Sequence, residues 1–132
     1  MIVVDASALV AIGRREPERI EFLRVLEVTD RAVLSAISYV ETGIVLSQRG
    51  DSFTPVNFNA LLSDLGVEVR EDVGLADVAL AAYLRFGKGF HPARLNLGDC
   101  FAYALAKQLD VPLLYKGDDF ARTDIRSALQ PT

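Results

Sequence analysis

The feature that most constrains the fold is the start of the chain, where a short apolar run ends on a carboxylate. Ile2, Val3 and Val4 are β-branched, which is typical of a buried strand, and Asp5 follows just before small residues that can begin a helix. In open α/β sheets, ligands bind at the carboxyl ends of the strands. We therefore expect Asp5 to be the first ligand of a metal site.

The composition limits the class of protein. With 132 residues, the chain is expected to form a single domain over residues 1–132 that buries a core without disulfides. Its one cysteine, Cys100, excludes an internal disulfide and suits a reducing cytoplasm. No apolar run approaches the roughly 18 residues that span a bilayer, and the start does not resemble a signal peptide. We expect a soluble, cytoplasmic protein.

The net charge of −4 argues mildly against nucleic-acid binding, because phosphate contacts need lysine and arginine. Carboxylates that hold divalent cations would reverse this argument, since the cations invert the electrostatics of the site. The charge balance alone therefore decides little.

Apolar periodicity predicts helices that alternate with strands. Such alternation indicates an α/β fold with a mostly parallel central sheet of four to five short strands and helices on both faces. The tail from residue 121 can add a short edge strand or helix. Expected strands cover 2–4, 32–35, 67–69 and 111–115. Expected helices cover 6–13, a stretch from Pro17 that includes Leu26, a stretch after Ser35 or Ser38 to about 49 before Gly50, 55–65, 75–86 and a stretch from Asp99. In the second of these helices, Ile20, Leu23 and Leu26 are expected on one face.

The helix that Ser35 or Ser38 can cap contains an anomaly. Ile37, Val40, Ile44 and Val45 form its predicted apolar stripe, and Glu41 lies within that stripe. A buried carboxylate is costly without a partner. A metal ion is one such partner, and an arginine is another.

The acidic residues that end strands or begin helices can meet at one edge of the sheet. They are Asp5, Glu41, Asp99, Asp118 and Asp119. Each has a simpler explanation, because Asp5 and Asp99 can cap helices and the Asp118–Asp119 pair can be turn residues. Their coincidence favours a site for Mg²⁺ or Mn²⁺, which prefer oxygen ligands.

The loop expected over residues 87–98 carries Lys88, His91 and Arg94. Cations of this kind contact a nucleic-acid backbone or only aid solubility. We interpret His91 as a surface residue and Cys100 as a core residue. Ser7 is either a helix cap or a hydrogen-bonding neighbour of the site, and Lys116 faces a phosphate or solvent. The candidates for substrate contacts are therefore Ser7, Lys88, Arg94 and Lys116.

Four stretches carry a family resemblance. They are Val-Val-Asp-Ala-Ser-Ala-Leu at 3–9, Ser-Tyr-Val-Glu-Thr at 38–42, Leu-Gly-Asp-Cys-Phe-Ala-Tyr-Ala-Leu-Ala at 97–106 and Leu-Leu-Tyr-Lys-Gly-Asp-Asp-Phe at 113–120. In order and spacing, the chain resembles the PIN-domain ribonucleases, and within them the VapC-type toxins of type II toxin–antitoxin systems.

The resemblance implies roles for the acidic residues. Asp5 and Asp99 would be the principal metal ligands, and Glu41 would complete or orient the coordination shell. An acidic residue of the last stretch would be the fourth. Many members place an extra residue between that position and the later Asp-Phe, whereas Asp118 and Asp119 are adjacent here. We assign Asp118 by its place after Gly117, with Asp119 as a cap, an outer-shell ligand or an alternative.

The resemblance also implies a function and partners. The chain would be a Mg²⁺-dependent endoribonuclease, with Mn²⁺ as a possible substitute, that uses a metal-activated water to leave 5′-phosphate and 3′-hydroxyl ends. It would inhibit translation and growth. A cognate antitoxin would neutralise it by covering its groove and directing a basic side chain into the carboxylates. A homodimer, and a heterotetramer or larger complex with the antitoxin, would be the assembled forms.

Two rival functions remain. A nuclease of the same architecture could act on DNA or on structured substrates. A non-enzymatic Mg²⁺-binding module of the receiver type also has acidic strand ends and a lysine comparable to Lys116. That module needs an early acidic pair, whereas Asp5 stands alone. The acidic residues near the third expected strand, Glu71 and Asp72, also do not suit a receiver site that has Glu41 where the sequence places it.

Overall fold

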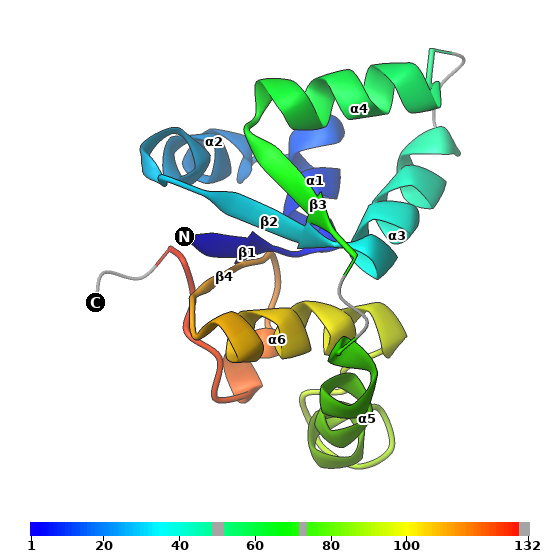
Figure 1. The fold of residues 1–132 in the computed structure, drawn as a ribbon, viewed down its shortest axis with the longest axis vertical. Coiled ribbons are helices and arrows are strands. Elements are labelled where there is room, and N and C mark those ends of the chain that lie inside the picture. The colour runs from blue at the N-terminus through cyan, green and yellow to red at the C-terminus, as the bar shows by residue number, and fades with distance from the viewer. Residues whose placement is uncertain (49–51, 72–73, 130–132) are drawn as a thin grey trace.

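The structure is a computed structural model that describes residues 1–48, 52–71 and 74–129, and its elements alternate as the sequence predicts (Figure 1). The strands are β1 (Ile2–Val4), β2 (Ala32–Ser35), β3 (Val67–Arg70) and β4 (Leu113–Leu114). The helices are α1 (Ala6–Gly13), α2 (Arg19–Val28), α3 (Ala36–Ser47), α4 (Pro55–Asp64), α5 (Leu75–Phe86) and α6 (Leu97–Leu109), followed by the 3₁₀ helix η1 (Phe120–Arg122).

All four strands are parallel and lie in the order β3-β2-β1-β4. Val3 pairs with Val33 on one side and with Leu113 on the other, so β1 is central. The chain winds from β1 to β3 in one direction and then returns to place β4 on the opposite side of β1. The strand order therefore reverses between β1 and β4. Open α/β sheets bind ligands at such a switch point, outside the carboxyl ends of the strands.

The side chains of β1 point alternately to two separate cores. Val3 packs with Val33 and Leu113 against α5 and α6. Ile2 and Val4 pack on the opposite face, against α1, α2 and α4. Figure 1 shows these two helical layers on either side of the sheet, with α3 beyond the carboxyl ends of the strands. The predicted α/β architecture is confirmed.

The predicted apolar stripe of α3 is wrong. Ile37, Val40 and Ile44 are 37 %, 54 % and 55 % exposed, whereas Ser38 and Thr42 are buried. The hydroxyl of Thr42 donates to the backbone carbonyl of Ser38 at 2.7 Å, so the buried polar group is satisfied within the helix. Small hydroxyl residues can therefore form the packed face of α3, and Ile37, Val40 and Ile44 lie outward.

One helix face and one helix boundary also differ from the predictions. In α2, Phe22 and Leu26 are buried and Ile20 is 52 % exposed. Helix α6 begins at Leu97 rather than at Asp99, because the side chain of Asn96 caps it. Ser35, one of the two predicted caps, is the cap of α3, and the predicted stop at Gly50 lies outside the described residues.

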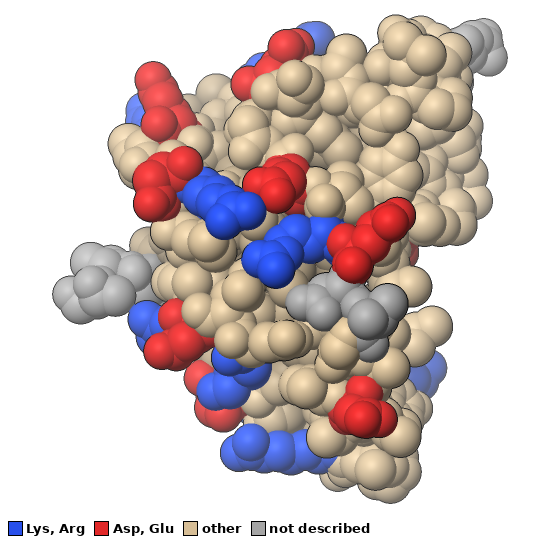
Figure 2. Space-filling model, viewed as in Figure 1, with Lys and Arg blue, Asp and Glu red and all other residues tan. Residues whose placement is uncertain are grey.

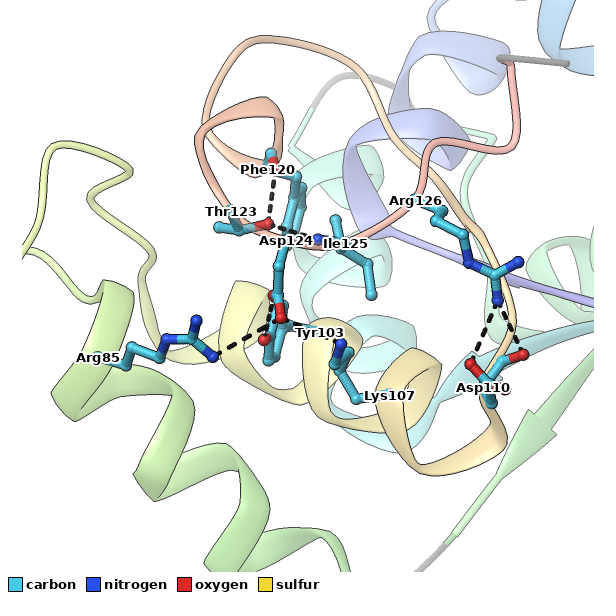
Figure 3. A network of polar contacts seen from close by, with 9 residues as sticks. All are labelled: Arg85, Tyr103, Lys107, Asp110, Phe120, Thr123, Asp124, Ile125 and Arg126. Carbon is cyan, nitrogen blue, oxygen red and sulfur yellow. Dashed lines mark hydrogen bonds and ion pairs between the residues drawn. The ribbon is translucent and has the colours of Figure 1, made fainter. Parts of the chain in front are cut away.

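The tail after β4 returns to the sheet and to α6. Ser127 forms a bridge with Leu113, which extends the sheet edge as predicted. Figure 3 shows that Asp124 accepts from the hydroxyl of Tyr103 and forms an ion pair with Lys107 at 3.1 Å. These contacts hold the tail on α6 and thereby fix the far end of the segment that carries Asp118 and Asp119.

No helix in the described part of the chain is long and apolar enough to cross a membrane. The expectation of a single domain over residues 1–132 stays a prediction.

Candidate functional site

Asp5 lies at the carboxyl end of β1 and caps α1, so its two oxygens have different surroundings. Oδ2 accepts a hydrogen bond from the backbone N–H of Ser7 at 3.0 Å. Asp5 is 2 % exposed, and its Oδ1 is buried without a hydrogen-bond partner among the described residues. A buried polar atom without a partner is costly. A cation at Oδ1 would remove this cost.

The environment of Asp5 also changes its acidity. Its pKa is raised from 3.8 to about 6, mainly by burial and to a smaller extent by the charge of Glu41, against the lowering effect of the hydrogen bonds from Ser7. Carboxylates perturbed in this way gather at functional sites. The simpler explanation of Asp5 as a helix cap therefore accounts for Oδ2, whereas Oδ1 stays available to bind a cation.

Asp99 is part of a capping box at the start of α6. Its backbone N–H donates to the side chain of Asn96 at 2.9 Å, and the backbone N–H of Asn96 donates to Asp99 Oδ2 at 3.0 Å. Burial raises the pKa of Asp99 to about 6, and the charges of Asp5 and Asp119 also raise it. The cap is therefore present, and Asp99 also lies within the electrostatic reach of two other carboxylates.

Glu41 reaches from α3 toward the first turn of α6, where its carboxylate lies against Gly98. Burial, and then the charge of Asp99, raises the pKa of this half-buried side chain. Within the described residues Glu41 forms no ion pair, so the alternative of an arginine partner does not hold there.

Asp118 and Asp119 follow β4 in an exposed turn that begins at Gly117, whose φ of 96° favours glycine. Asp119 directly precedes η1, and it is the residue of this pair whose charge acts on Asp99. The electrostatics therefore favour Asp119 over Asp118 as the neighbour of the buried carboxylates. The choice of ligand between them stays a prediction.

The carboxylates influence one another, but they do not form a ready-made cage. In the ranges 1–48, 52–71 and 74–129, no three side chains of the metal-ligating types are grouped closely enough to hold an ion as they stand. Ionised carboxylates repel in the absence of a cation. Binding an ion would therefore require side-chain rotations that bring the oxygens together around it.

Lys116 lies beside this site but is already paired. Its Nζ forms ion pairs with Glu16 at 2.9 Å and Glu18 at 3.0 Å, and its backbone N–H donates to the hydroxyl of Ser7 at 3.0 Å. Ser7 thus links the start of α1 to the end of β4, as a hydrogen-bonding neighbour of the site. Sequence reasoning missed both glutamates, because nothing local connects them to a residue about 100 positions later.

The loop between α5 and α6 contributes exposed cations but no acid. Lys88 and Arg94 are exposed. His91 accepts a hydrogen bond from the backbone N–H of Ala93 at 3.0 Å through Nδ1, and its ring packs edge-on against Phe86. It therefore helps to hold the loop.

Among the described residues on the face in Figure 2, acidic and basic side chains lie beside one another rather than in a basic stripe.

Comparison with known proteins gives a consistent result. The family model described as the PIN domain matches residues 2–126. "Ribonuclease VapC30" of Mycobacterium tuberculosis is 40% identical over 131 residues, which cover 98% of this chain and 100% of that protein. "Ribonuclease VapC42" of the same species is 42% identical over 129 residues, with 96% and 98% covered.

Solved structures agree on the fold. The crystal structure of VapC20 from Mycobacterium tuberculosis, described as a toxin that cleaves the sarcin-ricin loop, superposes with a TM-score of 0.75 at 19% identity, covering 95% of this chain and 96% of that one. A toxin–antitoxin complex from Klebsiella pneumoniae superposes with a TM-score of 0.69 at 15% identity, covering 94% and 93%. At these identities the likeness concerns the fold.

Proposed function

Because the chain belongs to the PIN-domain family, and within it to the VapC group, we propose that it is a divalent-metal-dependent endoribonuclease that acts as the toxin of a toxin–antitoxin pair. It would inhibit translation and growth from the cytoplasm until a cognate antitoxin neutralises it. The relatives named as ribonucleases support RNA as the substrate.

The observation that carries the proposal is Oδ1 of Asp5, which has no hydrogen-bond partner in the part of the chain that the structure describes. This atom is buried at the switch point of the sheet, beside the carboxylates of Glu41 and Asp99 whose charges act on one another. A buried acidic oxygen without a donor has no evident structural role. A Mg²⁺ ion, or Mn²⁺ in its place, suits a set of donors made only of oxygens.

The proposed ligands are Asp5, Glu41, Asp99 and an acid of the last turn, with Asp119 favoured by its effect on Asp99 and Asp118 as the alternative. A divalent cation bound there would activate water as the nucleophile and offset the charge of the phosphodiester. The chain's own task is to hold the carboxylates in place. Ser7 fixes one oxygen of Asp5, and the capping box fixes Oδ2 of Asp99.

Substrate contacts are proposed for the cations around the site. Lys88 and Arg94 project from an exposed loop and are available for phosphate contacts. Lys116 would first have to leave Glu16 and Glu18, so its contribution would require an exchange of ion-pair partners.

Purified protein with Mg²⁺ is expected to cut total cellular RNA and to leave 5′-phosphate and 3′-hydroxyl ends, because water attacks rather than the ribose 2′-hydroxyl. Sequencing with end-specific ligation measures both ends. As a control, an RNA of the mapped sequence that carries a single 2′-O-methyl group at the cleaved linkage should still be cut, because the methyl group blocks only attack by the 2′-hydroxyl. Recovery of 2′,3′-cyclic phosphate ends would contradict this mechanism.

The same assay separates the rival functions. Matched single-stranded RNA and DNA of the mapped sequence distinguish a ribonuclease from a nuclease that acts on DNA, and a hairpin version tests structured substrates. A receiver-like module would cut neither strand and would accept phosphate from a small phosphoramidate donor. Labelling of the protein without any cleavage would replace the nuclease proposal.

We propose a homodimer in addition to the antitoxin complex, and outward apolar side chains give it a surface. On α3, α5 and α6, the most exposed are Val40, Ile44, Leu80, Leu84 and Leu97. Large exposed apolar patches commonly mark protein interfaces. A predominantly apolar patch can also face a second copy of itself with little like-charge repulsion.

The wild-type chain is expected to sediment at about twice its mass of 14.4 kDa, and Leu84→Glu is expected to shift it toward the monomer. A charge buried within an apolar interface loses its hydration without gaining a partner. Ile20→Glu is the matched control, because Ile20 on α2 is 52 % exposed and Leu84 is 56 % exposed. A monomeric wild type, or equal dissociation by both variants, would contradict this surface.

A further inference from the structure

Gly98 lies in the first turn of α6, directly before Asp99, and it is buried against the carboxylate of Glu41. A Cβ atom built on Gly98 would lie 2.6 Å from both Cδ and Oε2 of Glu41 and closer still to Oε1. Real Cβ atoms do not approach other atoms this closely. The carboxylate therefore occupies the space that any other residue at position 98 would fill.

The backbone at position 98 does not itself require glycine. Among the described glycines, those with positive φ are Gly66, Gly89 and Gly117, where an added Cβ would meet nothing within 4 Å. Gly98 has ordinary helical geometry, and glycine is a poorer helix former than alanine. The position of the Glu41 carboxylate is thus the contact that excludes a side chain here.

At the contact between Glu41 and Gly98, the end of the Glu41 side chain can move more easily than the helix that carries it. Helix α3 packs against α1 and α6, and its buried face carries Ser38 and Thr42. A side chain at position 98 would thus displace the flexible end of Glu41 rather than the helix. The carboxylate would move outward, toward Val40 and Ile44, and away from its place beside Asp99.

We propose that Gly98 is a positioning residue whose missing side chain seats the Glu41 carboxylate next to Asp99 and so tunes the affinity of the site for a divalent cation. This inference rests on the proposed function, since it takes Glu41 to be one of the groups that hold the ion. Gly98 itself would touch neither the ion nor the RNA.

Gly98→Ala is expected to weaken Mg²⁺ binding about tenfold, in the range typical of changes to residues that orient metal ligands. Calorimetric titration measures the affinity without substrate. The melting temperature of the metal-free protein should stay unchanged or rise slightly, because the clash involves a mobile carboxylate and alanine favours the helix. Gly43→Ala is the matched control, since its Cβ would meet the ring of Phe58 at an ordinary 3.4 Å.

A double-mutant cycle tests whether Gly98 acts through Glu41. In the Glu41→Ala background, Gly98→Ala should have no further effect on Mg²⁺ affinity. Glu41→Asp retracts the carboxylate by one methylene, so adding Gly98→Ala to it should also cost little. An undiminished Mg²⁺ affinity in Gly98→Ala, or the same tenfold loss in the Glu41→Ala background, would overturn the proposal.

Other outcomes are equally informative. If Gly98→Ala alone does not fold, folding of the double variant with Glu41→Ala would support the contact, and failure of both would overturn the proposal. If Glu41→Ala binds Mg²⁺ as tightly as the wild type, the ligand role of Glu41 in the proposed function is wrong. That result differs from a failure of the inference, which would be an unchanged Mg²⁺ affinity when Gly98→Ala is introduced into the protein that keeps Glu41.

Discussion

Asp5→Asn is expected to abolish RNA cleavage and, at the same time, to raise the melting temperature of the metal-free protein. Asparagine keeps an oxygen that can accept from the Ser7 N–H, and it is also a good helix cap, so the fold should be retained. It removes the buried charge on which the proposed ion depends. Loss of activity with a gain in stability is typical of a residue retained for function.

The size of the stability gain follows from the acidity of Asp5. The difference between 3.8 and about 6 corresponds to about 3 kcal/mol of penalty for ionising the buried group at neutral pH. The buried amide of asparagine offsets part of this, so we expect a net rise of about 5 °C for a chain of this size. Differential scanning calorimetry in EDTA measures it.

Asp64→Asn is the control, because it makes the same chemical change at an exposed residue at the end of α4. It should leave both cleavage and melting temperature unchanged. Asp118→Asn and Asp119→Asn extend the comparison, and the larger loss of cleavage is expected for Asp119. If Asp5→Asn still cleaves at the wild-type rate, the proposed site is wrong.

The second expected result is that Mg²⁺ stabilises the wild-type protein at neutral pH and does so much less near pH 5. A ligand that binds only the folded state adds about 2.7 kcal/mol at a concentration of 100 times its Kd. Below about pH 6, protonation of Asp5 and Asp99 competes with the ion, because burial raises the pKa of both groups to about 6.

The metal-free protein should show the opposite dependence on pH. The pKa of Asp5 is higher in the folded than in the unfolded state, so its contribution to stability is lost as pH rises from about 4 through about 6. Other carboxylates, such as Asp124, have a lowered pKa and act in the opposite sense. The gap in melting temperature between Asp5→Asn and the wild type isolates Asp5. It should be near zero at pH 4 and reach its full size by about pH 7.

Thermal melts in EDTA and in millimolar Mg²⁺, measured at several pH values, test both statements. Asp5→Asn should lose most of the Mg²⁺ response. An equal Mg²⁺ response in the wild type and in Asp5→Asn would mean that the ion acts elsewhere on the protein.

Much of the fold was predictable because its signals are local. The β-branched run before Asp5, the alternation of strands and helices, and the glycine and proline boundaries each depend on residues within one or two turns. The two faces of β1 follow from the period of two along a strand. Asp5 and Asp99 could be singled out as candidates because each follows a boundary of this kind.

The interpretation of α3 failed because periodicity does not say which face is packed. Its apolar residues have the spacing of a core stripe, yet Ser38 and Thr42 face the neighbouring helices, with their hydroxyls satisfied locally. Glu41 stays a predicted ligand, although the argument for it assumed a buried apolar stripe, whereas Ile37, Val40 and Ile44 of that stripe are exposed. Its actual setting is a contact with Gly98, which lies 57 positions later in the chain.

The sequence by itself determined the strands, most helix boundaries, the parallel α/β class and the acidic candidates, because hydrophobic period, capping and turn preferences act between near neighbours. Only the tertiary structure decided that Oδ1 of Asp5 finds no donor among the residues described, that two glutamates hold Lys116, and that the carboxylate of Glu41 fills the space at Gly98. Those facts depend on side chains from distant segments meeting at one sheet edge. Desolvation and close contact there are properties of the packed molecule, which no local pattern encodes.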